Sequence, residues 1–154
     1  MAGGHSLTIN DEPTQVKGIV LDGDDHALVT VSTTFAHLAQ FGVLPVVGDS
    51  VHVFGNPGSF RDILRDGIVS GHYTLTSRHI AGKTLAFSHA VATIYDLNGF
   101  FGDSGSALFN DDGQIVGVIS FAIEQNTGQG DTWHAMASLP LAFTAAQMRK
   151  AESQ

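Results

Sequence analysis

The sequence contains no cysteine among its 154 residues. This absence excludes a disulfide framework and any metal site built on thiolates. Basic residues are few, with 7 lysines and arginines against 15 aspartates and glutamates, which gives a formal net charge of −8. A surface with that charge repels phosphate backbones, so we expect no nucleic-acid partner. No apolar run in the sequence approaches the roughly 20 residues of a membrane-spanning helix, so we expect no membrane partner either.

Two further absences concern targeting and metals. Residues 1–10 lack the basic start and the apolar stretch of a signal peptide. With the lack of cysteine, this favours a cytoplasmic or virion-associated protein, while a disulfide-free secreted protein made as part of a longer precursor stays open. The eight histidines show no His-x-x-His, His-x-His or HExxH spacing, so we expect no metal site and no cofactor.

What the sequence does contain is typical of a turn-rich β protein. Hydrophobic residues make up 43%, charged residues only 14%, and glycine occurs 18 times. Short β-branched segments alternate with turn signals, for example Asp111-Asp112-Gly113 between residues 104–110 and 114–123. The segment 139–151 instead has helical spacing. The pattern predicts an all-β barrel or sandwich followed by a C-terminal helix.

The stretch Gly102-Asp103-Ser104-Gly105 carries the strongest chemical signal. A serine nucleophile needs an exposed position on a tight loop, and backbone N–H groups of that loop must converge on the developing oxyanion. Glycines on both sides of Ser104 permit the unusual dihedral angles that such a loop requires. An ordinary Gly/Ser/Asp turn is the alternative interpretation.

Four motifs, in order along the chain, resemble those of trypsin-like serine proteases, in the style of the cysteine-free bacterial Deg/HtrA-type enzymes. They are Gly55-Asn56-Pro57, Asp66-Gly67-Ile68-Val69-Ser70, Gly102-Asp103-Ser104-Gly105, and Gly113 to Ser120. The resemblance covers about residues 48–154. It implies a chymotrypsin-like fold with a complete second barrel and a C-terminal helix in residues 48–154, and only part of a first barrel in residues 1–47.

The same resemblance implies roles for individual residues. Ser104 would be the nucleophile, and the N–H groups of Gly102 and Ser104 would form the oxyanion hole. Asn98 would lie near the base of the pocket for the P1 side chain. The substrate-pairing strand would be Ser120-Phe121-Ala122, and because it offers no charged pocket floor we expect a small or apolar P1 residue.

The family places its acid at the start of a buried strand, often as Asp-x-Ala-Leu, and Asp25-His26-Ala27-Leu28 fits that pattern. A simple turn at residues 22–25 explains the same letters. A serine hydroxyl also needs a base to take its proton. His5 precedes Asp25, as the family requires, but few residues precede it. His37 would displace Asp25 from its role. A third possibility is that the chain holds no base.

The first barrel would normally need about six strands, yet only four candidates precede residue 48. They are residues 6–9, 15–22, 27–31 and 43–47. A half-barrel leaves open edges that proteins normally cover. The sequence therefore predicts a serine endopeptidase or self-processing protease domain that acts on a peptide or protein substrate. The alternatives are a peptide-binding protein that has lost catalysis, and an inactive assembly protein, such as a component of a virus or phage particle, that docks onto neighbouring subunits.

Overall fold

The computed structural model describes residues 7–21, 26–57, 60–74, 77–80, 83–86, 91–99, 102–126 and 132–138. These residues fall into two compact units, with the division after Leu38. The expected C-terminal helix, residues 139–151, lies outside the described residues. Within the described ranges, no helix is long and apolar enough to span a membrane.

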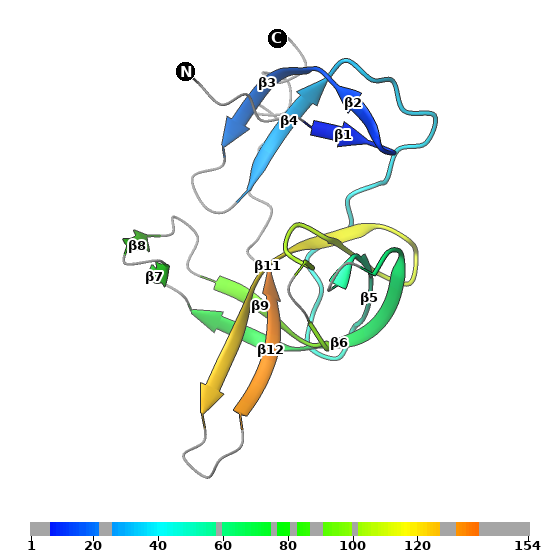
Figure 1. Ribbon diagram of the computed structural model, residues 1–154. Coiled ribbons are helices and arrows are strands. Elements are labelled where there is room, and N and C mark those ends of the chain that lie inside the picture. Colours follow the sequence, from blue (N-terminus) through cyan, green and yellow to red (C-terminus); the bar gives the residue numbers. More distant parts are fainter. Residues whose placement is uncertain are drawn as a thin grey trace. The chain divides into compact units, whose positions relative to one another are not determined.

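The first unit contains two small antiparallel sheets (Figure 1). Strands β1 (Leu7–Ile9) and β2 (Glu12–Thr14) form one, and strands β3 (Val16–Leu21) and β4 (Ala27–Val31) form the other. Asn10 and Asp11 join the first pair with φ angles of 52° and 64°. Two positive φ angles at the centre of a two-residue loop suit the right-handed twist of a hairpin, and Asn and Asp tolerate them. Three of the four segments predicted before residue 48 therefore contain a strand, whereas residues 43–47 form none.

The second unit is a closed antiparallel barrel with the strand order β10-β11-β12-β9-β6-β5. Its elements, together with the separate β7–β8 pair, are β5 (Ser50–Gly55), β6 (Ile63–Thr74), β7 (Ser77–Ile80), β8 (Lys83–Ala86), β9 (Val91–Asp96), β10 (Ala107–Phe109), β11 (Ile115–Asn126) and β12 (Thr132–Ser138). The β10–β5 pairing closes the barrel through Leu108 opposite Val53 and Phe109 opposite His52. We refer to this pairing as the seam.

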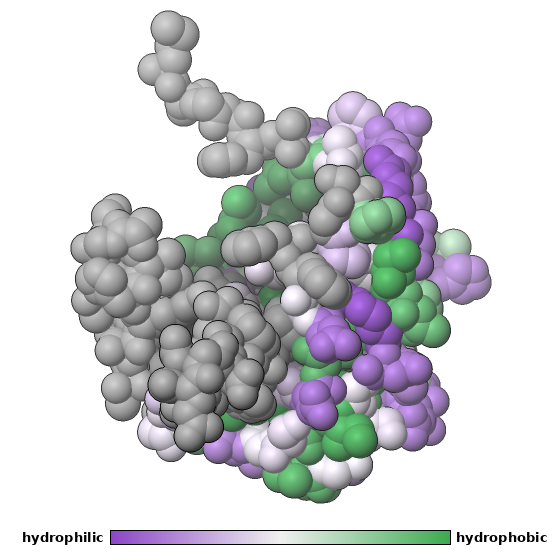
Figure 2. Space-filling model, turned by 60° about the horizontal axis from the view of Figure 1, so that its bottom comes forward, coloured by the Kyte–Doolittle hydropathy of each residue, from purple (hydrophilic) through white to green (hydrophobic). Residues whose placement is uncertain are grey.

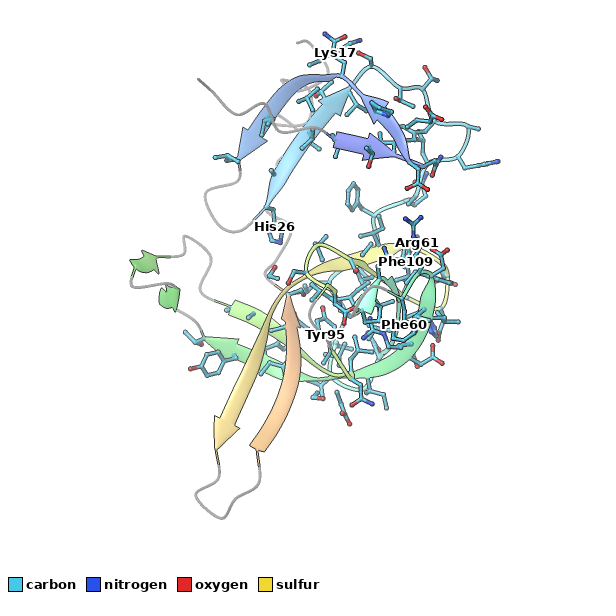
Figure 3. The ribbon with its side chains drawn as sticks, in the orientation of Figure 1. Lys17, His26, Phe60, Arg61, Tyr95 and Phe109 are labelled. Atoms are coloured by element: carbon cyan, nitrogen blue, oxygen red, sulfur yellow. The ribbon has the colours of Figure 1, made fainter. Side chains whose placement is uncertain are left out.

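Along the barrel strands, alternate side chains point into the barrel and form its core. In β5, Val51 and Val53 are fully buried, whereas Phe54 on the opposite face is exposed. Tyr95 lies among the barrel strands (Figure 3), and its hydroxyl forms a 2.7 Å hydrogen bond with the Ser138 hydroxyl. Burial raises the pKa of Tyr95, while the Ser138 hydrogen bond acts in the opposite direction. The core cluster consists of Val51, Val53, Val69, Tyr95, Leu97, Leu108, Val116 and Ile119.

The barrel surface mixes polar and apolar side chains, as Figure 2 shows for one face of the molecule. Cross-strand neighbours Phe54 and Leu64 are 57% and 52% exposed. A turn joins β10 to β11, and its Gly113 has a φ of 72°. The hairpin predicted around Asp111-Asp112-Gly113 is therefore confirmed.

Candidate active site

The segment 102–106 forms a turn that leads directly into β10. Gly102 and Gly105 have φ angles of 106° and 88°, which side-chain-bearing residues rarely adopt. The Ser106 N–H donates to the Asp103 carbonyl at 2.9 Å and closes the turn. Asp103 is completely buried, while the adjacent Ser104 is exposed. The loop therefore turns one polar side chain into the protein and presents the next to solvent.

A buried ion pair anchors this loop to the barrel. The Arg65 guanidinium donates from Nη1 to Asp103 Oδ2 at 2.8 Å and from Nη2 to Asp103 Oδ1 at 2.5 Å. The same Nη1 also donates to the Asn98 carbonyl at 2.6 Å. The Arg65 side chain is only 13% exposed. Two parallel bonds from a planar guanidinium fix both the position and the orientation of a carboxylate. Arg65 thus connects β6 to both ends of the segment 98–103.

Gly55 makes room for this ion pair at the end of β5. A Cβ atom on Gly55 would lie 2.6 Å from Asp103 Oδ1 and 2.9 Å from Arg65 Nη2. Both distances are shorter than real Cβ contacts allow. The first residue of the Gly55-Asn56-Pro57 motif must therefore be a glycine so that β5 can pack closely against the ion pair. The motif also changes the direction of the chain.

The backbone N–H groups of the loop divide into two sets. The Gly105 N–H donates to the Ile119 carbonyl at 2.8 Å, and the Ser106 N–H closes the turn described above. Within the described part of the chain, no backbone hydrogen bond uses the N–H of Gly102 or Ser104. These two donors are the pair that the resemblance to trypsin-like proteases assigns to the oxyanion hole.

The residues expected to contact substrate lie on two segments. Asn98 is exposed after β9, and its carbonyl is held by Arg65. Ser120 lies at an irregularity of β11, where the register with β12 shifts between Ile119 and Phe121. The backbones of Phe121 and Ala122 pair with Ala137 and Met136 of β12. Among the described strands, β12 is the sole partner of β11 from Phe121 onward, so no described strand pairs with the other edge of that stretch.

The proposed base and acid, His5 and Asp25, lie outside the described residues. In the first unit His26 is buried just before β4, and His37 is exposed. In the barrel, His52 contacts two carboxylates, and His72 lies 3.4 Å from the Thr93 hydroxyl. No group of three or more His, Asp or Glu side chains suited to a metal ion occurs in the ranges that the structure describes.

Two residues of this site, Arg65 and Gly55, were missed as functional residues by the sequence analysis. Arg65 could have been sought only once the burial of Asp103 was known, because a buried carboxylate needs a cation and the chain has only 7 lysines and arginines. Nothing in the sequence distinguishes Arg65 from the other six lysines and arginines. Gly55 was assigned only to a turn.

Sequence comparison places this site in a family context. The model of the trypsin-like peptidase domain matches residues 4–118, a range that includes His5, Asp25 and Ser104. No curated protein gives a significant match to the chain.

Solved structures of two proteases share the fold. The active form of the Rv3671c protease from M. tuberculosis matches with a TM-score of 0.70 and 20% identity, over 95% of this chain and 62% of that chain. An inactive form of the same protease gives a TM-score of 0.68 at 21% identity, over 97% and 74% of the two chains. The MamO protease domain from Magnetospirillum magneticum gives 0.54 at 21% identity, over 92% and 68%. The chain thus spans less than two thirds of the active-form structure.

Proposed function

We propose that this chain, which belongs to the trypsin-like peptidase domain family, is a serine endopeptidase domain with Ser104 as its nucleophile. The observation that carries the proposal is the anchored loop around Ser104. The buried Asp103 is held by Arg65, Ser104 itself is exposed, and the neighbouring glycines adopt positive φ angles. Rigid placement of a nucleophile and of its oxyanion donors lowers the barrier of acyl transfer, because little reorganisation is needed during the reaction.

In the proposed reaction, Ser104 Oγ attacks the carbonyl carbon of the scissile peptide bond while a histidine accepts the hydroxyl proton. The N–H groups of Gly102 and Ser104 stabilise the negative oxygen of the tetrahedral intermediate. The imidazolium then gives its proton to the leaving amine, and the C–N bond breaks. Water, activated by the same histidine, hydrolyses the acyl-enzyme and restores the Ser104 hydroxyl.

We assign the base to His5 and the orienting acid to Asp25. Support comes from the family match, which spans both residues together with Ser104. The sequence order His, Asp, Ser also agrees with that of chymotrypsin-type enzymes. His52, by contrast, is already bonded through both ring nitrogens.

The substrate class that fits the proposal is an extended peptide, in another protein or in this chain itself. A peptide would pair with the open edge of β11 at Phe121 and Ala122, and its P1 side chain would approach Asn98. Because these positions carry no charge, a small or apolar P1 residue is favoured.

The test is cleavage of a peptide library by the purified full chain, with products identified by mass spectrometry. Ser104→Ala should reduce cleavage at least about a thousandfold, because the nucleophile is removed. Ser70→Ala is the matched control, since Ser70 is an exposed serine elsewhere on the same barrel. Loss of activity in His5→Ala but not in His37→Ala would support the assigned base. Equal cleavage by the Ser104→Ala variant would reject the proposal.

One observation favours a second function, in which an inactive chain docks onto neighbouring subunits. Strands β3 and β4 form a sheet of only two strands, and the facing residues Ile19 and Val29 are 59% and 39% exposed. Two-stranded sheets are marginally stable in water and gain from an added partner. Two results together would favour this function over the first. No variant would cleave peptides, and the chain would form a stable oligomer that the substitution Ile19→Lys dissociates.

A further inference from the structure

His52 lies between two carboxylates that come from different elements of the barrel. Its Nδ1 is 2.7 Å from Asp66 Oδ1 on β6, and its Nε2 is 2.8 Å from Asp111 Oδ1 in the turn between β10 and β11. The His52 side chain is 32% exposed, and the two aspartates are 72% and 75% exposed. We refer to these three residues as the clasp.

The clasp crosses the seam of the barrel. His52 stands opposite Asp66 in the β5–β6 register and opposite Phe109 in the β10–β5 register. The described seam consists of two residue pairs, whereas the neighbouring β5–β6 pairing consists of six. The contact between His52 and Asp111 therefore adds a side-chain link where the backbone ladder is shortest.

Only the protonated form of His52 satisfies both contacts. An imidazolium donates from both nitrogens, whereas a neutral imidazole donates from one and presents a lone pair at the other. In the neutral form, one carboxylate would face that lone pair without a proton between them. The hydrogen bonds that His52 donates to Asp66 and Asp111 accordingly raise the pKa of His52 above its ordinary value of 6.5.

Among the described residues, the charged groups that face His52 are Asp66 and Asp111, both members of the clasp. Asp66 comes from β6 and Asp111 from the turn, while the neighbour on β10 is the uncharged Phe109. Arg65 precedes Asp66 but points to the other side of the strand, where it binds Asp103. No cation in the described ranges therefore offsets the two carboxylates at His52.

We propose that the His52–Asp66–Asp111 clasp makes closure of this barrel sensitive to pH. The clasp is fully formed when His52 is charged, and its link between the β10–β11 turn and β5 weakens as His52 loses its proton. The charged state prevails below pH 6.5, and its contribution to stability is lost as the pH rises through the higher value in the folded protein.

A weaker link between the β10–β11 turn and β5 affects the loop that carries Ser104 through backbone contacts. That loop continues into β10, and it is tied to β11 by the Gly105 N–H to the Ile119 carbonyl and by the Ile119 N–H to the Ser106 carbonyl. A looser seam leaves β10 with β11 as its sole strand partner among the described residues. The proposed pH sensitivity of the seam does not depend on whether Ser104 is catalytic.

The experiment is an NMR titration of the histidine rings in the full chain from pH 5 to 9, with amide hydrogen exchange measured across the same range. In the wild type His52 should titrate above 6.5, and in Asp111→Asn its pKa should fall toward 6.5. After correction for intrinsic exchange, protection of whichever amide of Leu108 and Phe109 donates to β5 should drop about two- to fivefold as His52 deprotonates, because an ion pair with a largely exposed carboxylate contributes little to stability. Protection at Ala92 and Thr93, on β9 away from the seam, should not follow the titration.

The variant His52→Gln removes the titrating group, and His72→Gln is its matched control on β6. The pH dependence at the seam should disappear in the first and persist in the second. Because Asp111→Asn changes an exposed turn residue, it keeps the test valid if His52→Gln does not fold. A His52 pKa at or below 6.5, or seam protection that changes with pH equally in His52→Gln, would overturn the proposal.

Discussion

The buried pair of Arg65 and Asp103 is the residue-level feature on which the candidate site depends most. A carboxylate removed from water costs several kcal/mol unless a cation and hydrogen bonds compensate it. Arg65 supplies both, through two bonds to Asp103 and one to the Asn98 carbonyl. The position of Ser104 is therefore tied, through the adjacent Asp103, to a residue of β6 that lies 38 positions before Asp103 in the chain.

Removing one member of this pair should destabilise the protein more than removing both. Arg65→Met leaves the Asp103 charge buried without its cation, so we expect a loss of about 3–5 kcal/mol in the free energy of unfolding. The double variant Arg65→Met/Asp103→Leu should recover much of that loss. Urea unfolding of the wild type, the two single variants and the double variant measures the coupling. Additive effects of the two substitutions would show that the pair does not act as a unit.

Gly55 should tolerate no side chain, because the added methyl group would meet the ion pair. We expect Gly55→Ala to lower the free energy of unfolding by about 1–3 kcal/mol, as overpacked sites do. Gly71→Ala on β6 is the control, since nothing lies within 4 Å of a Cβ atom at that position. The urea concentrations at the unfolding midpoints of the two variants test this expectation. Equal midpoints would mean that the space beside Asp103 is less restricted than the structure indicates.

Residue-level contacts of this kind were the part least accessible to prediction. The Gly102-Asp103-Ser104-Gly105 motif indicated a strained loop, and the positive φ angles of its glycines confirm that. The same letters did not indicate that Asp103 points inward or that Arg65 meets it. That pairing depends on the register of β6 against its neighbours, which no local pattern encodes.

At the scale of elements, the β10–β11 hairpin shows what local sequence determines well. Its turn was predicted from Asp111-Asp112-Gly113, and Gly113 does adopt a positive φ. The Gln114 N–H also donates a hydrogen bond to the Oδ1 of the Asn110 side chain at 2.8 Å. Turn chemistry acts over a few residues, so the sequence predicts it directly.

Two substitutions at Gly113 separate backbone strain from side-chain crowding. A Cβ atom there would meet nothing within 4 Å, so any cost arises from the φ of 72°. Gly113→Ala should cost about 1 kcal/mol, because Ala disfavours the left-handed region. Gly113→Asn should cost less, since Asn adopts that region more readily. Thermal unfolding of both variants tests the order. A larger loss for Asn than for Ala would contradict this explanation.

At the scale of the whole molecule, the antiparallel barrel follows from many short strands with regular turns, and the sequence predicted that class. The resemblance to trypsin-like proteases predicted a complete barrel in residues 48–154, but local patterns alone could not pair β10 with β5, because the seam joins segments more than 50 residues apart in the chain. The roles of His5 and Asp25 and the C-terminal helix stay predictions, because they fall outside the described residues. Residues 7–38 contribute two two-stranded sheets, which hold exposed apolar side chains such as Ile19 and Leu21.

The central claim is that the fold presents Ser104 as an activated nucleophile, and covalent labelling tests it most directly. A fluorophosphonate probe should form one adduct per folded chain, which peptide mapping by mass spectrometry should locate on Ser104. The wild type and Ser70→Ala should be labelled, whereas Ser104→Ala and the heat-unfolded wild type should not. A folded wild-type chain that takes up no probe at Ser104, or that labels equally well after unfolding, would contradict the claim.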